Sequence, residues 1–304
     1  MNQLRLFGGA VLESNGVPVT GRAAQRHRTA LLALLATTRR RFRSRDQLIT
    51  LLWPETDAER GRRMLSDSIY RINQALGGNV LVGPGEDVRM NRDQITSDVA
   101  AFEDAMEARD YPTAVSLYTG AFLDSFFLPG SPEFDRWMEI EREHYAQSMA
   151  KALEALALAA SGARLVTEAV DHWQQLALLV PDDSRIAMEL MRALEVAGNR
   201  AGALRHAKRH TELLRETLGF DPDRGVQELA TTIASRNVPR DLSRNFARPV
   251  IRSIAKPVTK KAGPDAKTYD LYVQARFHWH KRLEESLLLS VSLFEQVLAR
   301  EPMY

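Results

Sequence analysis

Residues 44–77 show the hydrophobic pattern of two short amphipathic helices joined by a tight turn. Ser44 precedes the first helix and Gln47 follows three residues later, which is the spacing of a capping box. Thr56 precedes the second helix with Glu59 in the matching place, and a glycine follows its last turn. The pattern therefore predicts a helix-turn-helix.

The second predicted helix has one apolar face and one charged face. At about 100° per residue, one stripe of roughly 60° contains its apolar positions, Leu65, Ile69, Ile72 and Leu76. The opposite face carries Arg60, Arg63, Asp67, Tyr70, Arg71 and Gln74. Arginine can hold guanine through two hydrogen bonds, glutamine can hold adenine, and aspartate can accept from cytosine. This face is a candidate for entering the DNA major groove, and an ordinary solvated helix face is the alternative.

The flanking segments complete a known arrangement. Short strands are predicted at residues 4–7 and 10–12, followed by an Asn-Gly turn and a helix over residues 22–38. A hairpin with a glycine-rich tip is predicted at residues 80–90. A helix-turn-helix with a trailing hairpin is a winged helix, whose wing can reach the DNA backbone or the minor groove. Arg89 is the candidate DNA contact on this wing.

Charge is unevenly distributed along the 304 residues, although the net charge is only +2. Residues 1–97 contain 15 arginines, no lysine and 9 acidic residues, so their net charge is +6. Residues 98–235 have a net charge of −10, and residues 236–304 return to +6. An arginine-only basic module favours bidentate recognition of phosphate or base edges. We expect the acidic middle segment to face away from DNA.

The acidic segment, residues 98–235, is predicted to be helical. Its internal spacing indicates repeats of about 34 residues, the tetratricopeptide period. Ala157 and Ala169 fall at the two small packing positions of one repeat, and Ala203 falls at the second such position of the next. A plain α-helical bundle is the alternative. The predicted fold class is thus mainly α, with a winged helix that contains small β elements followed by a tetratricopeptide-like domain.

The last third of the sequence changes character. Residues 236–265 contain four prolines and a basic residue at every fourth position, which predicts a solvated basic linker. Adhesion of this linker to an acidic surface is the alternative. Residues 266–304 are interpreted as the start of a further helical repeat. Because a lone helix pair cannot bury its apolar face, we expect that repeat to be truncated here.

Several kinds of chemistry are missing from the sequence. Cysteine is absent, which excludes disulfides and thiol catalysis and suits a cytosolic protein. No apolar run approaches 18 residues, so no membrane span is predicted, and there is no phosphate-binding loop of an ATPase. His206 and His210 have a spacing that zinc ligands can use, but no carboxylate motif accompanies them, so a solvated helix face is predicted. We expect no enzymatic activity, no cofactor and no metal.

Five short blocks resemble a known family. They are Leu-Arg-Leu-Phe-Gly-Gly at 4–9, Leu-Leu-Trp-Pro-Glu at 51–55, Arg-Ile-Asn-Gln-Ala-Leu-Gly at 71–77, Leu-Tyr-Thr-Gly-Ala-Phe-Leu at 117–123 and Leu-Pro-Gly-Ser-Pro-Glu-Phe-Asp-Arg-Trp at 128–137. In this order they resemble the bacterial transcriptional activator domain family, in antibiotic-regulatory-type activators that join an OmpR-type winged helix to a tetratricopeptide-like domain. The resemblance covers about residues 3–235. Residues 266–304 more weakly resemble the first repeat of longer tetratricopeptide tails on bacterial regulators.

The resemblance implies a sequence-specific transcription activator. It implies that residues 57–76 form the recognition helix, that double-stranded DNA and RNA polymerase are the partners, and that two copies pair as a homodimer on direct repeats. The alternative function is a protein-interaction scaffold, in which the winged helix is structural or binds protein. Asp67 and the acidic wing tip at Glu86 and Asp87 favour this alternative, because they repel phosphate.

Overall fold

The computed structural model describes most of the first 236 residues and one later helix. The described residues are 1–21, 25–38, 42–83, 85–236, Leu271, Gln274 and the helix α12 (Glu284–Arg300). The chain divides into two compact units, Met1–Val238 and Pro239–Tyr304. Apart from Arg236, the predicted linker lies outside the described residues, and so do the parts of the predicted repeat other than Leu271, Gln274 and α12. Within the described ranges, no helix is long and apolar enough to cross a membrane.

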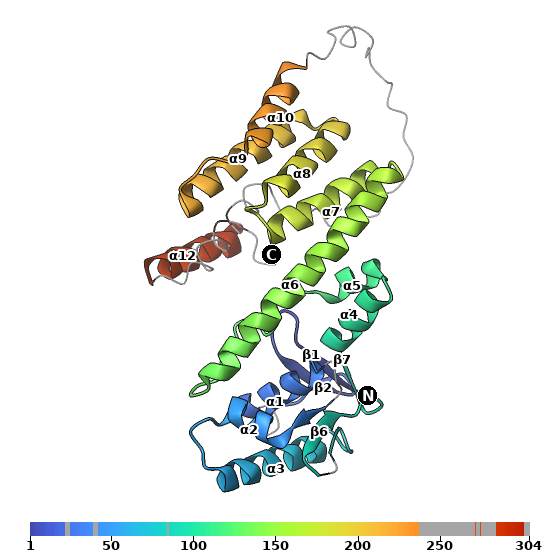
Figure 1. Ribbon diagram of the computed structural model, residues 1–304, viewed down its shortest axis with the longest axis vertical. Coiled ribbons are helices and arrows are strands. Elements are labelled where there is room, and N and C mark those ends of the chain that lie inside the picture. Colours follow the sequence, from blue (N-terminus) through green and yellow to red (C-terminus); the bar gives the residue numbers. More distant parts are fainter. Residues whose placement is uncertain are drawn as a thin grey trace. The chain divides into compact units, whose positions relative to one another are not determined.

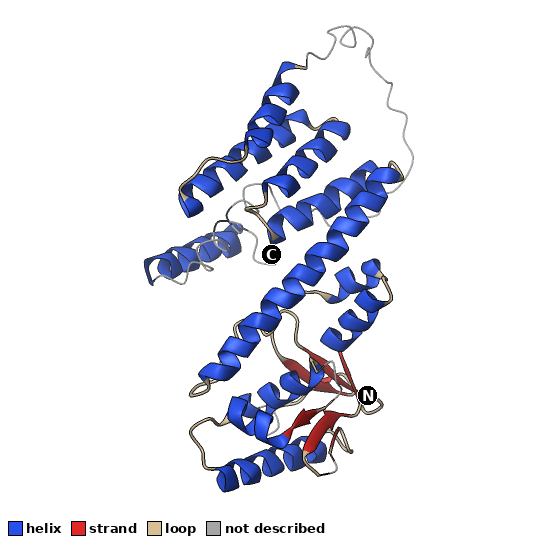
Figure 2. Ribbon diagram, in the orientation of Figure 1, coloured by secondary structure: helices blue, strands red, loops and turns tan. Residues whose placement is uncertain are grey.

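The N-terminal part of the first unit has the order of elements of a winged helix (Figures 1 and 2). The elements are β1 (Asn2–Arg5), β2 (Val11–Ser14), β3 (Val17–Pro18), α1 (Arg26–Ala36), β4 (Arg43–Ser44), α2 (Arg45–Leu52), α3 (Ala58–Ala75), β5 (Leu81–Val82), β6 (Asp87–Met90) and β7 (Ile95–Ser97). One sheet has the strand order β3-β2-β1-β7, with β7 parallel to β1 and the other pairs antiparallel. The second sheet, β4-β6-β5, is antiparallel and contains the wing hairpin. The predicted fold class is confirmed.

Local sequence signals set two features of this part. Asn15 and Gly16 join β2 to β3 with φ angles of 52° and 77°. Positive φ at both central residues is what a type I′ hairpin turn requires, so the predicted turn is confirmed. Ser44 caps α2, because its Oγ accepts a hydrogen bond from the Gln47 backbone N–H at 3.3 Å.

Two helix starts differ from the prediction. Asp57, not Thr56, caps α3, and its Oδ1 accepts from the Arg60 backbone N–H at 2.9 Å. Thr56 belongs to the preceding turn, where its own N–H donates to the Trp53 carbonyl. The first helix begins at Arg26, four residues after the predicted start. Both differences lie at helix ends, where neighbouring polar residues compete for the capping position.

Leucine-rich faces form the core of the winged helix. The fully buried side chains include Leu4, Leu6, Leu31, Leu32, Leu34, Leu48, Leu52, Leu65, Ile72, Val80 and Val88. The predicted burial of Trp53 and Leu65 is confirmed, since they are 7% and 0% exposed. Helices α2 and α3 approach closely at Gly61, where a Cβ atom would lie 2.5 Å from the Ile49 Cγ2 atom. This close packing fixes which side of α3 faces outward.

The remainder of the first unit is helical, as predicted. Its helices are α4 (Asp98–Glu107), α5 (Tyr111–Leu117), α6 (Pro132–Gly162), α7 (Val166–Leu179), α8 (Ser184–Val196), α9 (Arg200–Leu218) and α10 (Arg224–Ser235). The 31 residues of α6 span roughly 46 Å, so this helix extends from the winged helix to α7 (Figure 1). From α6 to α10 each helix packs against the next. Ala157, Ala169 and Ala203 are buried where small packing residues were predicted.

The predicted solvated face at His206 and His210 is wrong. His210 is 3% exposed, and it belongs to a buried stripe at helical spacing, Ala203, Ala207, His210 and Leu214. Its Nδ1 lies 3.0 Å from the Pro181 carbonyl oxygen and its Nε2 lies 3.0 Å from Ser184 Oγ. A carbonyl oxygen can only accept, so Nδ1 donates to it, and Nε2 forms the hydrogen bond with Ser184 Oγ. His210 therefore holds the α7–α8 turn against α9.

A loop from the helical part extends the N-terminal sheet. The Gly8 N–H donates to the Ala121 carbonyl at 3.0 Å, and the Leu123 N–H donates to the Leu6 carbonyl at 2.7 Å. A Cβ atom on Gly120 would lie 2.8 Å from the Gly8 Cα atom, so glycine is required for this approach. We call these two segments, residues 6–9 and 119–123, the seam.

Asp98 supports the seam from the other side. Its buried carboxylate accepts backbone N–H bonds from Leu6 at 2.8 and 2.9 Å, from Phe7 at 3.0 Å and from Val99 at 2.8 Å. Burial raises the pKa of Asp98, and these hydrogen bonds oppose that rise because they favour the charged form. The strand edge beyond β1 is thus hydrogen-bonded to the helical part rather than to water.

Aromatic rings and one arginine side chain contact the two segments of the seam. Phe7 lies in edge contact with Phe102 and Tyr145, with ring centroids 5.3 and 5.2 Å apart. Arg142 of α6 donates from Nε to the Phe122 carbonyl at 2.8 Å and from Nη2 to the Leu123 carbonyl at 2.6 Å. The winged helix and the helical part therefore share one continuous core.

We expect Gly120→Ala to lower the free energy of unfolding by about 1–3 kcal/mol, because the added methyl group has to displace backbone atoms of Gly8. Chemical denaturation of the full chain measures this. Gly162→Ala is the matched control, since a Cβ atom there meets nothing within 4 Å. Equal stability of the two variants would contradict the tight seam.

The half-buried position of His206 predicts a pH dependence. Burial lowers the pKa of His206 from 6.5 to about 4, and the charges of Arg209 and His210 add to this effect. Between pH 6.5 and 4 the unfolded chain binds the proton more readily, so stability falls as the pH falls through this window. Denaturation at several pH values should show wild type losing about 1–3 kcal/mol there that His206→Gln does not lose. Parallel pH profiles would show that His206 is not the group responsible.

Candidate nucleic-acid interface

The outward side of α3 carries the six helix residues that the sequence predicted. Arg60, Arg63, Asp67, Tyr70 and Gln74 are exposed and Arg71 is half-buried. Tyr70 is 61% exposed. The structure therefore brings these six residues together on one surface, because Leu65 and Ile72 hold the opposite side of the helix in the core.

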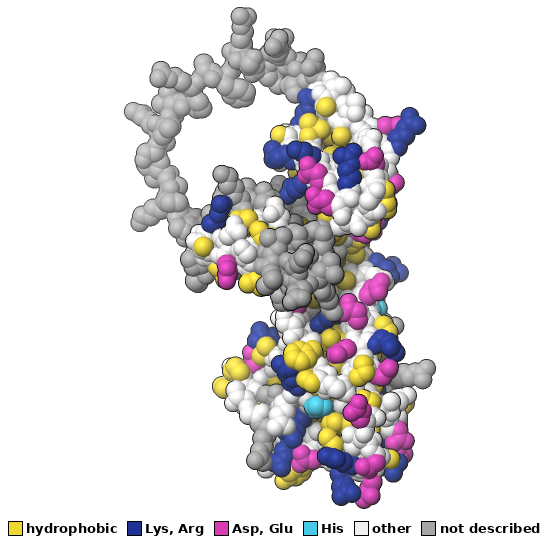
Figure 3. All heavy atoms as spheres, turned by 90° about the vertical axis from the view of Figure 1, so that its left-hand side faces the viewer, with side chains coloured by type: hydrophobic (Ala, Val, Ile, Leu, Met, Phe, Trp, Pro, Cys, Tyr) yellow, Lys and Arg dark blue, Asp and Glu magenta, His cyan; other side chains and the backbone are white. Residues whose placement is uncertain are grey.

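Most of the arginines on this helix are paired with acids. Arg63 Nη2 lies 2.8 Å from Glu59 Oε1, and both side chains are more than 70% exposed. Arg62, which the sequence analysis did not single out, lies 3.7 Å from Asp46 of α2. Such exposed pairs contribute about 0–1 kcal/mol, so a phosphate group can displace the acid at little cost. Basic and acidic side chains lie next to one another over the winged helix (Figure 3).

Asp67 is in a different situation, because both of its oxygens are bonded. Oδ2 lies 3.0 Å from Nη2 of Arg28, a residue of α1 whose side chain is only 9% exposed. Oδ1 lies 3.1 Å from Nε of Arg71, one turn further along α3. Sequence reasoning missed Arg28, since its partner is 39 residues away and nothing in its own helix marks it. Base recognition by Asp67 stays a prediction.

Hydrogen bonds of two residues, Asn73 and Arg45, fix the wing relative to α2 and α3. Asn73 of α3 donates from Nδ2 to the Leu81 carbonyl and accepts the Leu81 N–H at Oδ1, both at 2.8 Å. Arg45 of α2 donates its backbone N–H to the Glu86 carbonyl at 2.7 Å and its Nε to the Gly85 carbonyl at 2.9 Å. The wing is therefore attached at its base to α3 and at its tip to α2.

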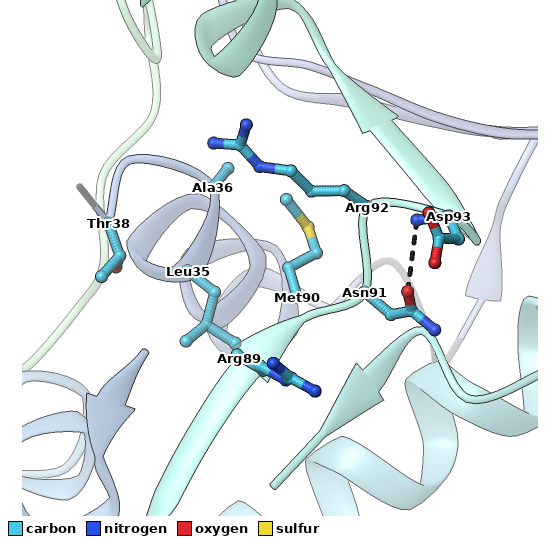
Figure 4. A pocket seen from close by; sticks show the side chains of 8 residues that line it. All are labelled: Leu35, Ala36, Thr38, Arg89, Met90, Asn91, Arg92 and Asp93. Carbon is cyan, nitrogen blue, oxygen red and sulfur yellow. Dashed lines mark hydrogen bonds between the residues drawn. The ribbon is translucent and has the colours of Figure 1, made fainter. Parts of the chain in front are cut away.

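Arg89, the predicted wing contact, is exposed on β6. It borders a hollow of about 240 Å³ between the end of α1 and the loop before β7. Figure 4 shows Arg89 extending from β6 and Arg92 extending from the loop before β7, in different directions. Arg92 pairs with Asp104 of α4 at 3.3 Å, so it is partly neutralised. The hollow therefore has no convergent charged groups that indicate a small ligand. In the described ranges, no group of three or more acidic or histidine side chains could hold a metal.

Comparison with known proteins agrees with the observed fold. Residues 88–234 match the family model described as "Bacterial transcriptional activator domain". A similar solved structure is Mycobacterium tuberculosis EmbR in complex with a low-affinity phosphopeptide, with 20% sequence identity and a TM-score of 0.55. The match covers 77% of this chain and 65% of the EmbR chain, and at this identity it shows the shared fold. No curated protein sequence matches.

Proposed function

We propose that this chain, whose residues 88–234 belong to the bacterial transcriptional activator domain family, is a sequence-specific DNA-binding transcription activator. The family match supports a role in transcription regulation. In this proposal α3 lies in the major groove, the wing contacts the DNA backbone, and the helical part contacts other proteins.

The observation that carries the proposal is the outward surface of α3. One side of α3 packs into the core of the winged helix. The other side faces away from that core and carries arginine, tyrosine and glutamine side chains together. Its arginines form weak exposed pairs that DNA can replace.

The pairing of Asp67 also weakens the case for the scaffold alternative. Asp67 favoured that alternative because its negative charge repels phosphate, but Arg28 and Arg71 offset this charge locally. The wing tip remains acidic at Glu86, so the wing contributes to DNA binding mainly through Arg89. A chain that binds no promoter-derived duplex would make the scaffold the better hypothesis.

Contacts with RNA polymerase and pairing as a homodimer on direct repeats are proposed from the family resemblance. For the polymerase, the acidic helical part offers a surface that DNA would repel, so both partners can be held at once. Footprinting of the full chain upstream of neighbouring genes would test the DNA-binding proposal, and repeated footprints at a fixed spacing would support the homodimer.

Arg63→Ala should weaken binding to the preferred duplex by about 1–3 kcal/mol and relax discrimination at one base position. Arg224→Ala of α10 is the matched control, because Arg224 forms an equally long pair, 2.8 Å, with the acid one turn away. Gel shifts with single-base variants of the site measure both effects. Equal loss in the two variants would mean that Arg63 acts through net charge alone.

Arg89→Ala should behave differently from the helix variant. If the wing contacts the backbone, binding to all duplexes weakens alike, and the dependence of log affinity on log salt becomes shallower by about one unit. Titrations at four salt concentrations check this. An unchanged salt dependence would place Arg89 outside the interface.

A further inference from the structure

Arg28, Asp67 and Arg71 form a chain of charges from the core of the winged helix to its outer surface. Arg28 is anchored in α1, with 9% of its side chain exposed. Asp67 is 49% exposed and accepts from Arg28 at Oδ2 and from Arg71 at Oδ1. Arg71 is 35% exposed and ends the chain at the surface.

The atoms used in this chain leave one end of Arg71 available. Arg71 is held through Nε, at 3.1 Å from Asp67. Within the described part of the chain, its two terminal nitrogens have no protein acceptor. A guanidinium that is held at Nε keeps a fixed plane and can still donate two parallel hydrogen bonds from Nη1 and Nη2.

Arg63 provides the contrast on the same helix. It is held through a terminal nitrogen, Nη2, by Glu59, and both side chains are more exposed than Arg71 and Asp67. To bind DNA through both terminal nitrogens, Arg63 has to release this acid. Arg71 has no such requirement, because Asp67 accepts from Nε and the two parallel hydrogen bonds come from Nη1 and Nη2.

We propose that Arg28 and Asp67 are positioning residues that orient Arg71 toward a pair of acceptor atoms on duplex DNA. This inference rests on the proposed function. It gives Asp67 a role other than reading a base, since both of its oxygens are already bonded within the protein. The acceptor pair is either the O6 and N7 atoms of a guanine or two oxygens of one phosphate group.

A double-mutant cycle in the full chain tests the coupling. Wild type, Asp67→Asn, Arg71→Ala and the double variant are titrated with the preferred duplex and with a random duplex. We expect Asp67→Asn to lower affinity for the preferred duplex about 5- to 10-fold when Arg71 is present, and not to lower it when residue 71 is alanine. A simple repulsive role for Asp67 would instead raise affinity equally in both backgrounds, and that result would overturn the proposal.

Glu59→Gln is the matched control, because it removes one negative charge from the same helix surface. It should leave affinity unchanged or raise it for both duplexes. Thermal unfolding of each variant separates a loss of fold from a loss of positioning. A drop in affinity caused by Glu59→Gln of the same size as that caused by Asp67→Asn would count against a specific role of Asp67.

The two acceptor sources give different signatures for Arg71→Ala. Loss of discrimination at one G·C pair identifies the guanine, whereas equal weakening on all duplexes with a salt dependence shallower by about one unit identifies the phosphate. Either result supports positioning if the cycle shows coupling. Arg28→Lys should reproduce part of the Asp67→Asn loss, because the ammonium cannot keep the same bond geometry. Wild-type chain that binds no duplex would refute the proposed function itself, whereas binding without coupling would refute only this inference.

Discussion

The close approach of Gly8 and Gly120 is the constraint on which the rest of the first unit depends. Two glycines let the backbone of the helical part reach the strand edge beyond β1 and continue its hydrogen bonding. Asp98 accepts the remaining N–H groups at that edge, which would otherwise be buried without partners. The aromatic rings around Phe7 then fill the space behind the seam. The orientation of α3 relative to the helical part follows from these contacts.

Local features of the fold could be predicted from the sequence because their causes are local. Hydrophobic periodicity and the cap at Ser44 depend on residues within one or two helical turns. The Asn-Gly turn depends on two adjacent residues that tolerate positive φ. These signals were sufficient to locate α3 and to identify its outward residues. They failed at helix ends, where Thr56 and Asp57 were both acceptable caps.

The remaining features depend on pairs that are distant in the sequence. Asp98 bonds to residues more than 90 positions earlier, and the burial of His210 depends on a turn that precedes it by 26 to 29 residues. The Leu-Tyr-Thr-Gly-Ala-Phe-Leu block carried the family resemblance, but nothing in its composition indicated that it completes a sheet. Likewise, Asp67 and Arg28 form an ion pair only when α1 and α3 are packed together. A single sequence without known contacts does not show which acid forms an ion pair with which arginine.

The seam also limits how such proteins can be recombined. A winged helix that ends at Ser97 loses the segment that satisfies the Leu6 and Gly8 backbone groups and exposes Phe7. A fusion that transplants this winged helix onto another protein would therefore have to carry the chain through Leu123 as well. The smallest segment that keeps the winged helix fully hydrogen-bonded is then larger than the winged helix itself, and it ends inside the segment that the family model matches.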